Sequence, residues 1–205
     1  PYTSIIRDAI TLRYSLLPII YTAFYDASQT GLPVIKPLFY ETPENPESYS
    51  IDDEFFIGDS GILVKPVTEE DAKTVKTYIP DNSRYYYFNE GIINGKYISK
   101  KGYYEEGVKL ETIPMFLKGG SIVFKKERYR RSTRAMVDDP YHIIIGLDEN
   151  ESANGKLYID DGATFEYLDG KFSILEIRAS GLEISSKLND EGSAINEKVV
   201  VEKIS

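Results

Sequence analysis

The first 30 residues carry the apolar pattern of a helix. Apolar side chains recur there at steps of three and four, which is the period of a helix with one buried face. The positions are Ile6, Ala9, Ile10, Leu17, Ile20, Tyr21, Phe24 and Ala27. Thr3 or Ser4 is the predicted N-cap and Gly31 the predicted C-terminal stop. Pro18 lies inside this stretch and is predicted to kink the helix or to split it.

Almost every position from Leu16 to Tyr25 is apolar. A helix that is apolar all round is normally buried on more than one side. It is either a core helix of this chain or a helix that packs against a partner outside the chain. The second interpretation predicts that Leu16, Leu17, Ile20 and Phe24 stay partly in water in an isolated monomer, at about 1.5–3 kcal/mol for each large side chain. It also predicts that the helix is displaced, poorly ordered or packed against another copy.

After Leu32 the pattern changes to that of β-structure. Short runs rich in Val, Ile, Tyr and Thr are separated by turn residues such as Pro80–Ser83, which predicts many short strands. The predicted strands are Gly61–Lys65, Lys73–Ile79, Arg84–Phe88, Met115–Leu117, Ser121–Phe124, Tyr141–Leu147, Lys156–Ile159, Phe172–Ala179 and Lys198–Ile204. The predicted fold is therefore mainly β: an N-terminal helix followed by two antiparallel β-sandwich domains.

Turn and loop signals divide the β-region. Asn-Gly and Asp-Gly pairs favour two-residue hairpin turns, because both turn positions need a positive φ. The pairs are Asn94-Gly95, Asn154-Gly155 and Asp169-Gly170. Gly119-Gly120 is a further predicted turn, and the polar segments 40–53 and 187–198 are predicted loops. The charged segment Lys125–Asp139 is the predicted boundary between the two domains.

Composition narrows the function classes. The net charge of −9 disfavours nucleic acid and anionic membranes as partners. Cysteine is absent, which excludes disulfides, thiol catalysis and cysteine-based metal sites, and the single histidine, His142, excludes multi-histidine sites. We predict no metal site, no cofactor and no membrane span, since a spanning helix needs about 20 apolar residues. A start at Pro1, with neither Met nor a signal sequence, is expected of a fragment.

Three clusters of functional side chains have both a chemical and a structural interpretation. The carboxylates of Asp52-Asp53-Glu54 and Asp160-Asp161 suit acid–base work or calcium, but solvated or turn-forming roles are favoured. A basic run suits phosphate binding, but internal ion pairs or an acidic neighbour are favoured. Its members are Lys125, Lys126, Arg128, Arg130, Arg131 and Arg134. Arg84–Phe88 offers a sugar-stacking platform or, more simply, a core strand. His142 is interpreted as a plain strand histidine without a nearby nucleophile.

The order of several motifs resembles a known family. The segments are RYSLLPIIYTAF at 13–24, GLPVIKPL at 31–38, ETP at 41–43, DEFFIG at 53–58, LVKPV at 63–67 and IPMFLKGGSI at 113–122. They resemble the end of the catalytic barrel and the region after it in α-glucosidases of glycoside hydrolase family 31. Further segments, KERYRRS at 126–132 with DP at 139–140 and GKLYIDDG at 155–162, resemble the glucosidase II branch of that family. Ile19, Lys36 and Glu54 stand where the family often has an aromatic residue, Arg and Gln.

The resemblance implies a layout and a role. Residues 1–32 would be the last barrel helix, 33–124 a proximal β-sandwich and 125–205 part of a distal, truncated one. The segment would be the non-catalytic C-terminal portion of a retaining α-glucosidase that trims glucose from N-linked glycans in the endoplasmic reticulum. Its partners would be the catalytic barrel of the same protein, a regulatory β subunit and, for the full-length enzyme, the glycan.

No residue of this chain matches the family's catalytic motifs, so none is predicted to be catalytic, and the chain alone is predicted to be inactive. The single sequon, Asn150-Glu151-Ser152, makes Asn150 a glycosylation candidate in a predicted exposed loop. Two alternatives remain open: a free-standing carbohydrate-binding module and a protein-docking domain.

Overall fold

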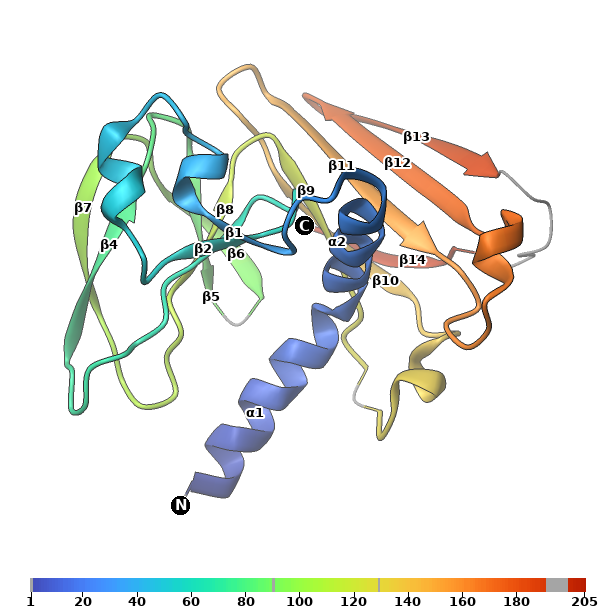
Figure 1. Cartoon of the computed structure of the whole chain (residues 1–205), viewed down its shortest axis with the longest axis horizontal. Coiled ribbons are helices and arrows are strands. Elements are labelled where there is room, and N and C mark those ends of the chain that lie inside the picture. Colours follow the sequence, from blue (N-terminus) through green and yellow to red (C-terminus); the bar gives the residue numbers. More distant parts are fainter. Residues whose placement is uncertain (1, 90, 129, 191–198) are drawn as a thin grey trace.

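The computed structural model describes residues 2–89, 91–128, 130–190 and 199–205. Within these ranges the chain forms two α-helices, four 3-10 helices, two six-stranded sheets and one two-stranded sheet. Figure 1 shows the first sheet on the left, the second on the right and helix α2 between them. The fold is therefore mainly β with its helices at the N-terminal end, as the sequence predicts.

Two consecutive helices stand where one was predicted, α1 (Tyr2–Ser15) and α2 (Leu17–Thr30). Pro18 lies in the first turn of α2, where its missing N–H would have had no intrahelical partner, so the predicted split is confirmed. The predicted N-cap at Thr3 or Ser4 is wrong, because α1 already begins at Tyr2.

The C-terminal stop of the helical region is confirmed. Gly31 adopts a left-handed φ of 73° and its N–H donates to the carbonyl of Ala27 at 2.8 Å. Glycine reaches this conformation without the steric penalty of a Cβ, and it satisfies a carbonyl that the helix end leaves free.

The first sheet is antiparallel throughout. Its strands, in spatial order, are β1 (Ile35–Pro37), β2 (Phe55–Ile57), β3 (Ile62–Val64), β8 (Met115–Lys118), β5 (Tyr85–Asn89) and β6 (Ile92–Ile98). Strands β4 (Thr74–Ile79) and β7 (Gly102–Gly107) pair separately as a two-stranded antiparallel sheet. Segment 40–53, predicted as a loop, contains the 3-10 helix η2 (Pro46–Ser50) and the end of η1 (Leu38–Tyr40).

The second sheet is mixed rather than purely antiparallel. Its spatial order is β13 (Glu183–Asp190), β12 (Ser173–Ser180), β11 (Ser152–Ile159), β9 (Ser121–Lys125), β10 (Tyr141–Gly146) and β14 (Val201–Ile204). Strands β10 and β14 are parallel, and β11 meets β9 at a single parallel pair, Asn154 with Ser121. Apolar residues of β9 and β10 share one core with those of β11 and β12. Strand β9 already pairs in this sheet from Ser121, while the domain boundary in Lys125–Asp139 stays a prediction.

The predicted hairpin turns have other places in the fold. Asn154-Gly155 lies inside β11, where a Cβ on Gly155 would come 2.6 Å from the carbonyl oxygen of Ile122 in β9. The glycine is thus needed for a close strand approach and not for a turn. Asn94-Gly95 lies inside β6 beside an irregularity in the β5–β6 register, with Gly95 at a φ of 79°. Asp169-Gly170 ends the 3-10 helix η4 (Glu166–Asp169).

Strand β13 is absent from the prediction because its sequence is mostly polar. Residues 187–190 of the predicted loop 187–198 belong to it, and 191–198 lie outside the described residues. Pairing with β12 over eight positions, rather than an apolar face of its own, defines this strand.

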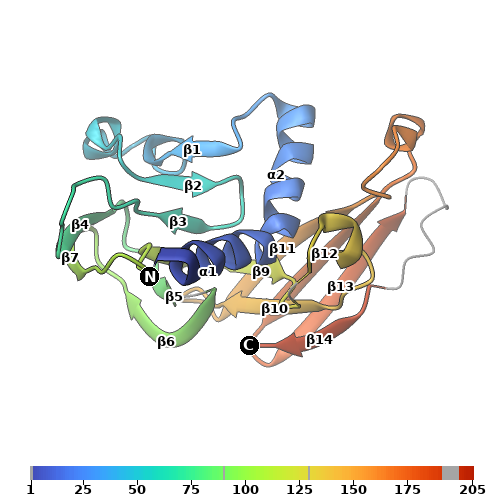
Figure 2. The ribbon, with the colours of Figure 1, turned by 90° about the horizontal axis from the view of Figure 1, so that it is seen from below.

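Helix α2 fills the seam between the two sheets (Figure 2). Tyr158 N donates to Thr22 Oγ1 at 3.0 Å, which satisfies an amide on the edge of β11 that β9 leaves free. Lys156 of β11 pairs with Asp26. On the opposite side, a Cβ on Gly58 would lie 2.5 Å from Ala23 Cβ. Helix α2 is therefore in direct contact with both sheets.

The predicted displacement of this helix is wrong. The helix packs between the two sheets. The predicted partial exposure is confirmed for three of the four side chains, because Leu17 and Ile20 are half-buried and Phe24 is 58% exposed, whereas Leu16 is buried. Helix α1 differs, because none of its residues is buried. No helix in the described ranges has both the length and the apolar character that a membrane span requires.

Candidate functional site

The first carboxylate cluster is part of the packing beside the first sheet. Lys65 is buried and forms ion pairs with Asp53 and, at 3.5 Å, with Glu54. Glu54 Oε1 accepts the Tyr78 N–H at 2.8 Å and so fastens β4 to this region. Burial raises the pKa of Glu54 to about 7, against the opposing effects of the Tyr78 amide and Lys65. These contacts connect elements of the fold.

The second carboxylate cluster joins α2 to a turn. Asp160 accepts hydrogen bonds from the hydroxyls of Tyr21, at 2.6 Å, and Tyr158, at 3.0 Å. Asp161 accepts from the amide and the hydroxyl of Thr164, which gives the expected Asx-type turn. Among the residues that the structure describes, no three His, Asp or Glu side chains gather closely enough to hold a metal ion.

The basic run pairs largely within the chain, as predicted. Arg130 grips Asp139 through two nitrogens, with Nη2 2.6 Å from Oδ1 and Nε 2.9 Å from Oδ2. Lys125 pairs with Glu127 at 3.0 Å. Lys126 is buried, and its ammonium donates to two backbone carbonyls at 2.7 Å.

The aromatic strand β5 is core on both faces, which confirms the favoured interpretation as a core strand over that of a sugar-stacking platform. Tyr85 and Tyr87 contribute to one apolar cluster, whereas Tyr86 and Phe88 contribute to another. Strand alternation predicts this division. Tyr86 also donates its hydroxyl proton to the carbonyl of Leu147 at 2.6 Å, which links the first sheet to the end of β10.

The structure gives His142 two neighbours that the sequence did not reveal. Its Nδ1 lies 2.6 Å from Glu127, and its Nε2 lies 2.9 Å from the Ser205 hydroxyl. Burial lowers the pKa of His142, although the hydrogen bond to Glu127 opposes the shift. Hydrogen bonds from Lys125 and His142 outweigh burial and hold the pKa of Glu127 at about 2.

Ser205, His142 and Glu127 follow one another like the members of a Ser-His-acid triad. Their burial and strand contacts indicate a structural role and not a catalytic one. The imidazole of His142 is only 2% exposed, and His142 lies in β10, which pairs with β14. Ser205 directly follows β14, so the contact fastens that strand to the sheet. Linear sequence gave no signal for it, because the partners lie 15 and 63 residues away.

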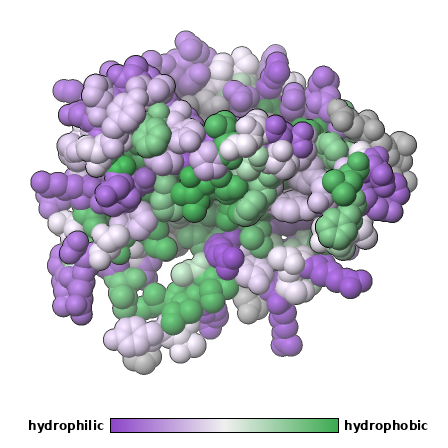
Figure 3. Space-filling model, viewed as in Figure 1, coloured by the Kyte–Doolittle hydropathy of each residue, from purple (hydrophilic) through white to green (hydrophobic). Residues whose placement is uncertain are grey.

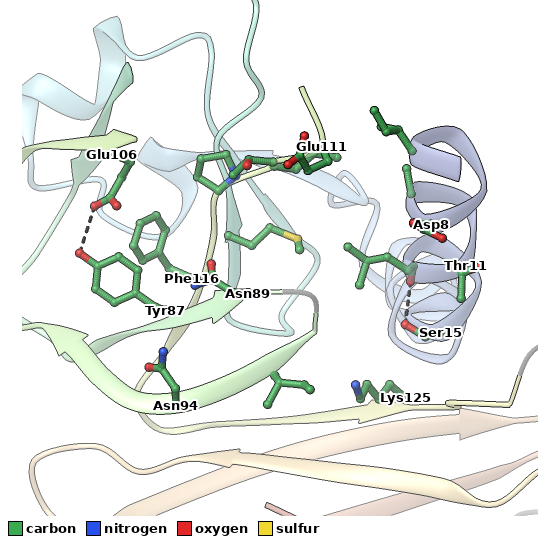
Figure 4. A pocket seen from close by; sticks show the side chains of 18 of the residues that line it. Asp8, Thr11, Ser15, Tyr87, Asn89, Asn94, Glu106, Glu111, Phe116 and Lys125 are labelled. Atoms are coloured by element: carbon green, nitrogen blue, oxygen red, sulfur yellow. Dashed lines mark hydrogen bonds between the residues drawn. The ribbon is translucent and has the colours of Figure 1, made fainter. Parts of the chain in front are cut away.

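A large cleft separates α1 from the first sheet (Figure 4). Its volume is about 1060 Å³, with Asp8 and Thr11 of α1 on one wall and Tyr87 and Glu106 on the other. Glu106 accepts the Tyr87 hydroxyl proton at 3.0 Å, and burial raises its pKa against the effect of that bond. The cleft adjoins the unburied helix α1 and leaves both of its walls accessible to further polypeptide.

Comparisons with known proteins give the family. Residues 31–123 match the glycosyl hydrolase family 31 C-terminal domain. The chain is 43% identical to neutral alpha-glucosidase AB of Dictyostelium discoideum, over 100% of this chain and 22% of that protein. It is 42% identical to glucosidase 2 subunit alpha of Saccharomyces cerevisiae, over 84% of this chain and 18% of that protein.

A solved structure agrees in fold. The catalytic subunit in an ER glucosidase II heterodimeric complex matches with a TM-score of 0.87 and 38% identity, over 95% of this chain and 21% of the other. The chain thus spans about a fifth of the length of the relatives it matches. Residues 31–123 therefore match a glycosyl hydrolase family 31 C-terminal domain, in a chain that is similar over nearly its whole length to about a fifth of glucosidase II-type α-glucosidases.

Proposed function

We propose that this chain is the non-catalytic C-terminal part of a retaining α-glucosidase of the glucosidase II type. Such enzymes use two carboxylates about 5 Å apart across the scissile bond. In our proposal, that carboxylate pair lies outside residues 1–205, in a catalytic barrel that this chain supports. The full-length enzyme would remove glucose from N-linked glycans in the lumen of the endoplasmic reticulum. The similarity to relatives about five times longer supports this assignment.

The observation that carries the buttressing role is the state of α1. Ile6 and Ile10 are 57% and 47% exposed, and the large cleft runs beside the helix. An isolated helix of this length is marginal in water, because most helical stability comes from tertiary packing. We infer that the barrel packs on α1 and fills the cleft.

The test uses the full-length protein. Ile6→Asp with Ile10→Asp should lower its melting temperature by several degrees and reduce kcat/KM for an α-glucoside, because two charges enter the interface. Leu182→Asp is the matched control, since Leu182 is fully exposed on the turn between β12 and β13. Equal effects of the control and of the α1 variant would contradict the proposal.

The chain alone should not hydrolyse an α-glucoside, because each acidic cluster described above is engaged by lysine, backbone or hydroxyl partners. Turnover of 4-nitrophenyl α-glucoside by the purified chain is the measurement. Activity that a point change within these residues abolishes would overturn the assignment.

A regulatory subunit is the proposed protein partner of the full-length enzyme. The support is the structural neighbour solved as a complex of a catalytic subunit with the binding domain of its regulatory subunit. The carbohydrate-module alternative loses its motivation, since strand β5 is buried.

Asn150 is the proposed glycosylation site. It is exposed, and its N–H donates to Asp148 Oδ1 at 2.8 Å in a tight loop. Expression in a secretory host should add a glycan mass that Asn150→Gln removes. Full occupancy by unmodified asparagine would contradict the proposal.

A further inference from the structure

A second, smaller cleft lies between the end of α1 and the segment that connects β9 to β10. Its volume is about 330 Å³, and Ile10 and Tyr14 line its helical side. The opposite side carries Lys126, Arg128, Arg130 and Arg131. Four cations thus border one cleft on a chain whose net charge is −9.

The cleft is held in shape by backbone and side-chain contacts. Lys126 N donates to the carbonyl of Ser15 at 3.0 Å, which ties the connecting segment to the end of α1. The ammonium of Lys126 is fixed by the carbonyls of Met136 and Val137. Arg130 is fixed by its two bonds to Asp139.

Two arginines at this cleft keep binding capacity. Arg131 is exposed and has no hydrogen bond or ion pair with any residue in the described ranges. Arg128 approaches Glu202 only at 3.4 Å, and its side chain is 49% exposed. Glu127, a carboxylate of the same lining, is bound by Lys125 and His142. The charge that remains available for binding in this cleft is therefore positive.

We propose that this cleft binds the carboxylates of an acidic protein segment that packs along α1. The proposal rests on the proposed function, in which further polypeptide covers that helix. A guanidinium binds a carboxylate through two parallel hydrogen bonds, and the opposite wall supplies apolar contact through Ile10 and the ring of Tyr14. A peptide segment uses both walls, whereas an inorganic oxyanion uses only the cations.

The first experiment titrates the purified chain with three probes: a ten-residue polyglutamate peptide, a ten-residue polyglutamine peptide and inorganic phosphate. Polyglutamate should bind, and added salt should weaken its binding. Arg131→Gln should reduce that affinity at least fivefold. Arg134→Gln is the matched control, because it removes the same charge from an exposed position of the same segment outside the cleft lining, and it should change affinity less than twofold.

Three outcomes would overturn the proposal. They are no binding of polyglutamate, an equal loss in both variants, or binding of phosphate as tight as that of the peptide. Arg131 and Arg134 are both exposed, so neither substitution should impair folding.

The second experiment separates this inference from the proposed function. In the full-length protein, Arg131→Glu should lower the melting temperature more than Arg134→Glu does. The α1 variant used here is Ile6→Asp alone, because Ile10 lines the cleft and Ile6 does not. If Ile6→Asp lowers stability while Arg131→Glu matches its control, the buttressing role stands and the acidic segment is refuted. If only Arg131→Glu has an effect, an acidic segment at the cleft stands and the packing of the barrel on Ile6 is refuted.

Discussion

Helices α1 and α2 are neighbours in sequence and equal in length, at 14 residues each, yet they differ in how they pack against the rest of the chain. Both carry apolar residues at helical spacing. Only α2 buries side chains, namely Ile19, Thr22 and Ala23. Thr22 and Ala23 have small side chains, so a hydrogen bond and a close approach position the helix together with the burial of Ile19.

The difference lies in what each helix meets. Helix α2 meets a strand edge that needs a hydrogen-bond acceptor and a glycine that allows close approach. Helix α1 meets two open clefts. The apolar side chains of a helix thus set how much free energy it gains from packing. The amide at the edge of β11 and the glycine beside Ala23 determine where α2 packs.

Gly58→Ala tests the close approach of the chain to α2 and has one of the largest expected effects. Gly58→Ala should lower the free energy of unfolding by about 2–4 kcal/mol, because the new Cβ meets Ala23 and the φ of 48° is unfavourable for a side chain. Gly31→Ala is the matched control, since it has a similar φ and nothing within 4 Å, and it should cost only about 1 kcal/mol. Denaturant unfolding measures both. Equal losses would show that the contact with Ala23 is not tight.

Two threonines give a sharper comparison of the helices. Thr11 in α1 and Thr22 in α2 each donate to the carbonyl four residues earlier, at 2.9 Å. Only Thr22 also accepts the N–H of Tyr158. Thr22→Val should therefore lower the free energy of unfolding by about 1–3 kcal/mol, because a buried amide loses its partner.

Thr11→Val serves as the control, and it should change the free energy of unfolding by less than about 0.5 kcal/mol, because the hydrogen bond of Thr11 is exposed to solvent. Hydrogen exchange at the Tyr158 amide should quicken in the first variant only. If the amide stays protected in Thr22→Val, α2 does not seal the edge of β11 in the way described.

The region beside the first sheet should respond to pH through Glu54. Its folded-state pKa of about 7 lies above the ordinary value of 4.5 for a glutamate, so the folded protein holds the proton more tightly. The free energy of unfolding should then fall by about 1–3 kcal/mol as the pH rises from 4.5 through 7. Glu54→Gln keeps the acceptor for Tyr78 N and should flatten this dependence. Asp52→Asn, an exposed neighbour, should leave it intact.

Much of the fold could be predicted from the sequence, and the gaps share a cause. The split at Pro18, the stop at Gly31 and the faces of β5 follow from local rules that need no partner. The Asn154-Gly155 pair was misread because its glycine serves a contact with Ile122, which is distant in sequence. Strand β13 was missed because its pairing with β12 and not its pattern defines it.

The candidate site was harder to predict for the same reason. The basic run was visible in the sequence, and so was its internal pairing. Its closeness to Ile10 and Tyr14 of α1 was not, because more than 100 residues separate the two walls. The contact of His142 with Ser205 is similarly non-local. Sites assembled from distant segments leave no spacing in the sequence to detect.

The smallest expected effect concerns α1 itself. In this chain alone, Ile6→Ser should change the free energy of unfolding by less than about 0.5 kcal/mol, because the side chain is already more than half in water. Ile19→Ser in α2, where the side chain is 4% exposed, should cost about 2–5 kcal/mol. The same pair measured in the full-length protein should converge, since the barrel would bury Ile6. If Ile6→Ser remains neutral there, the exposed face of α1 is a solvent surface in the intact enzyme as well, and the contrast between the helices is permanent.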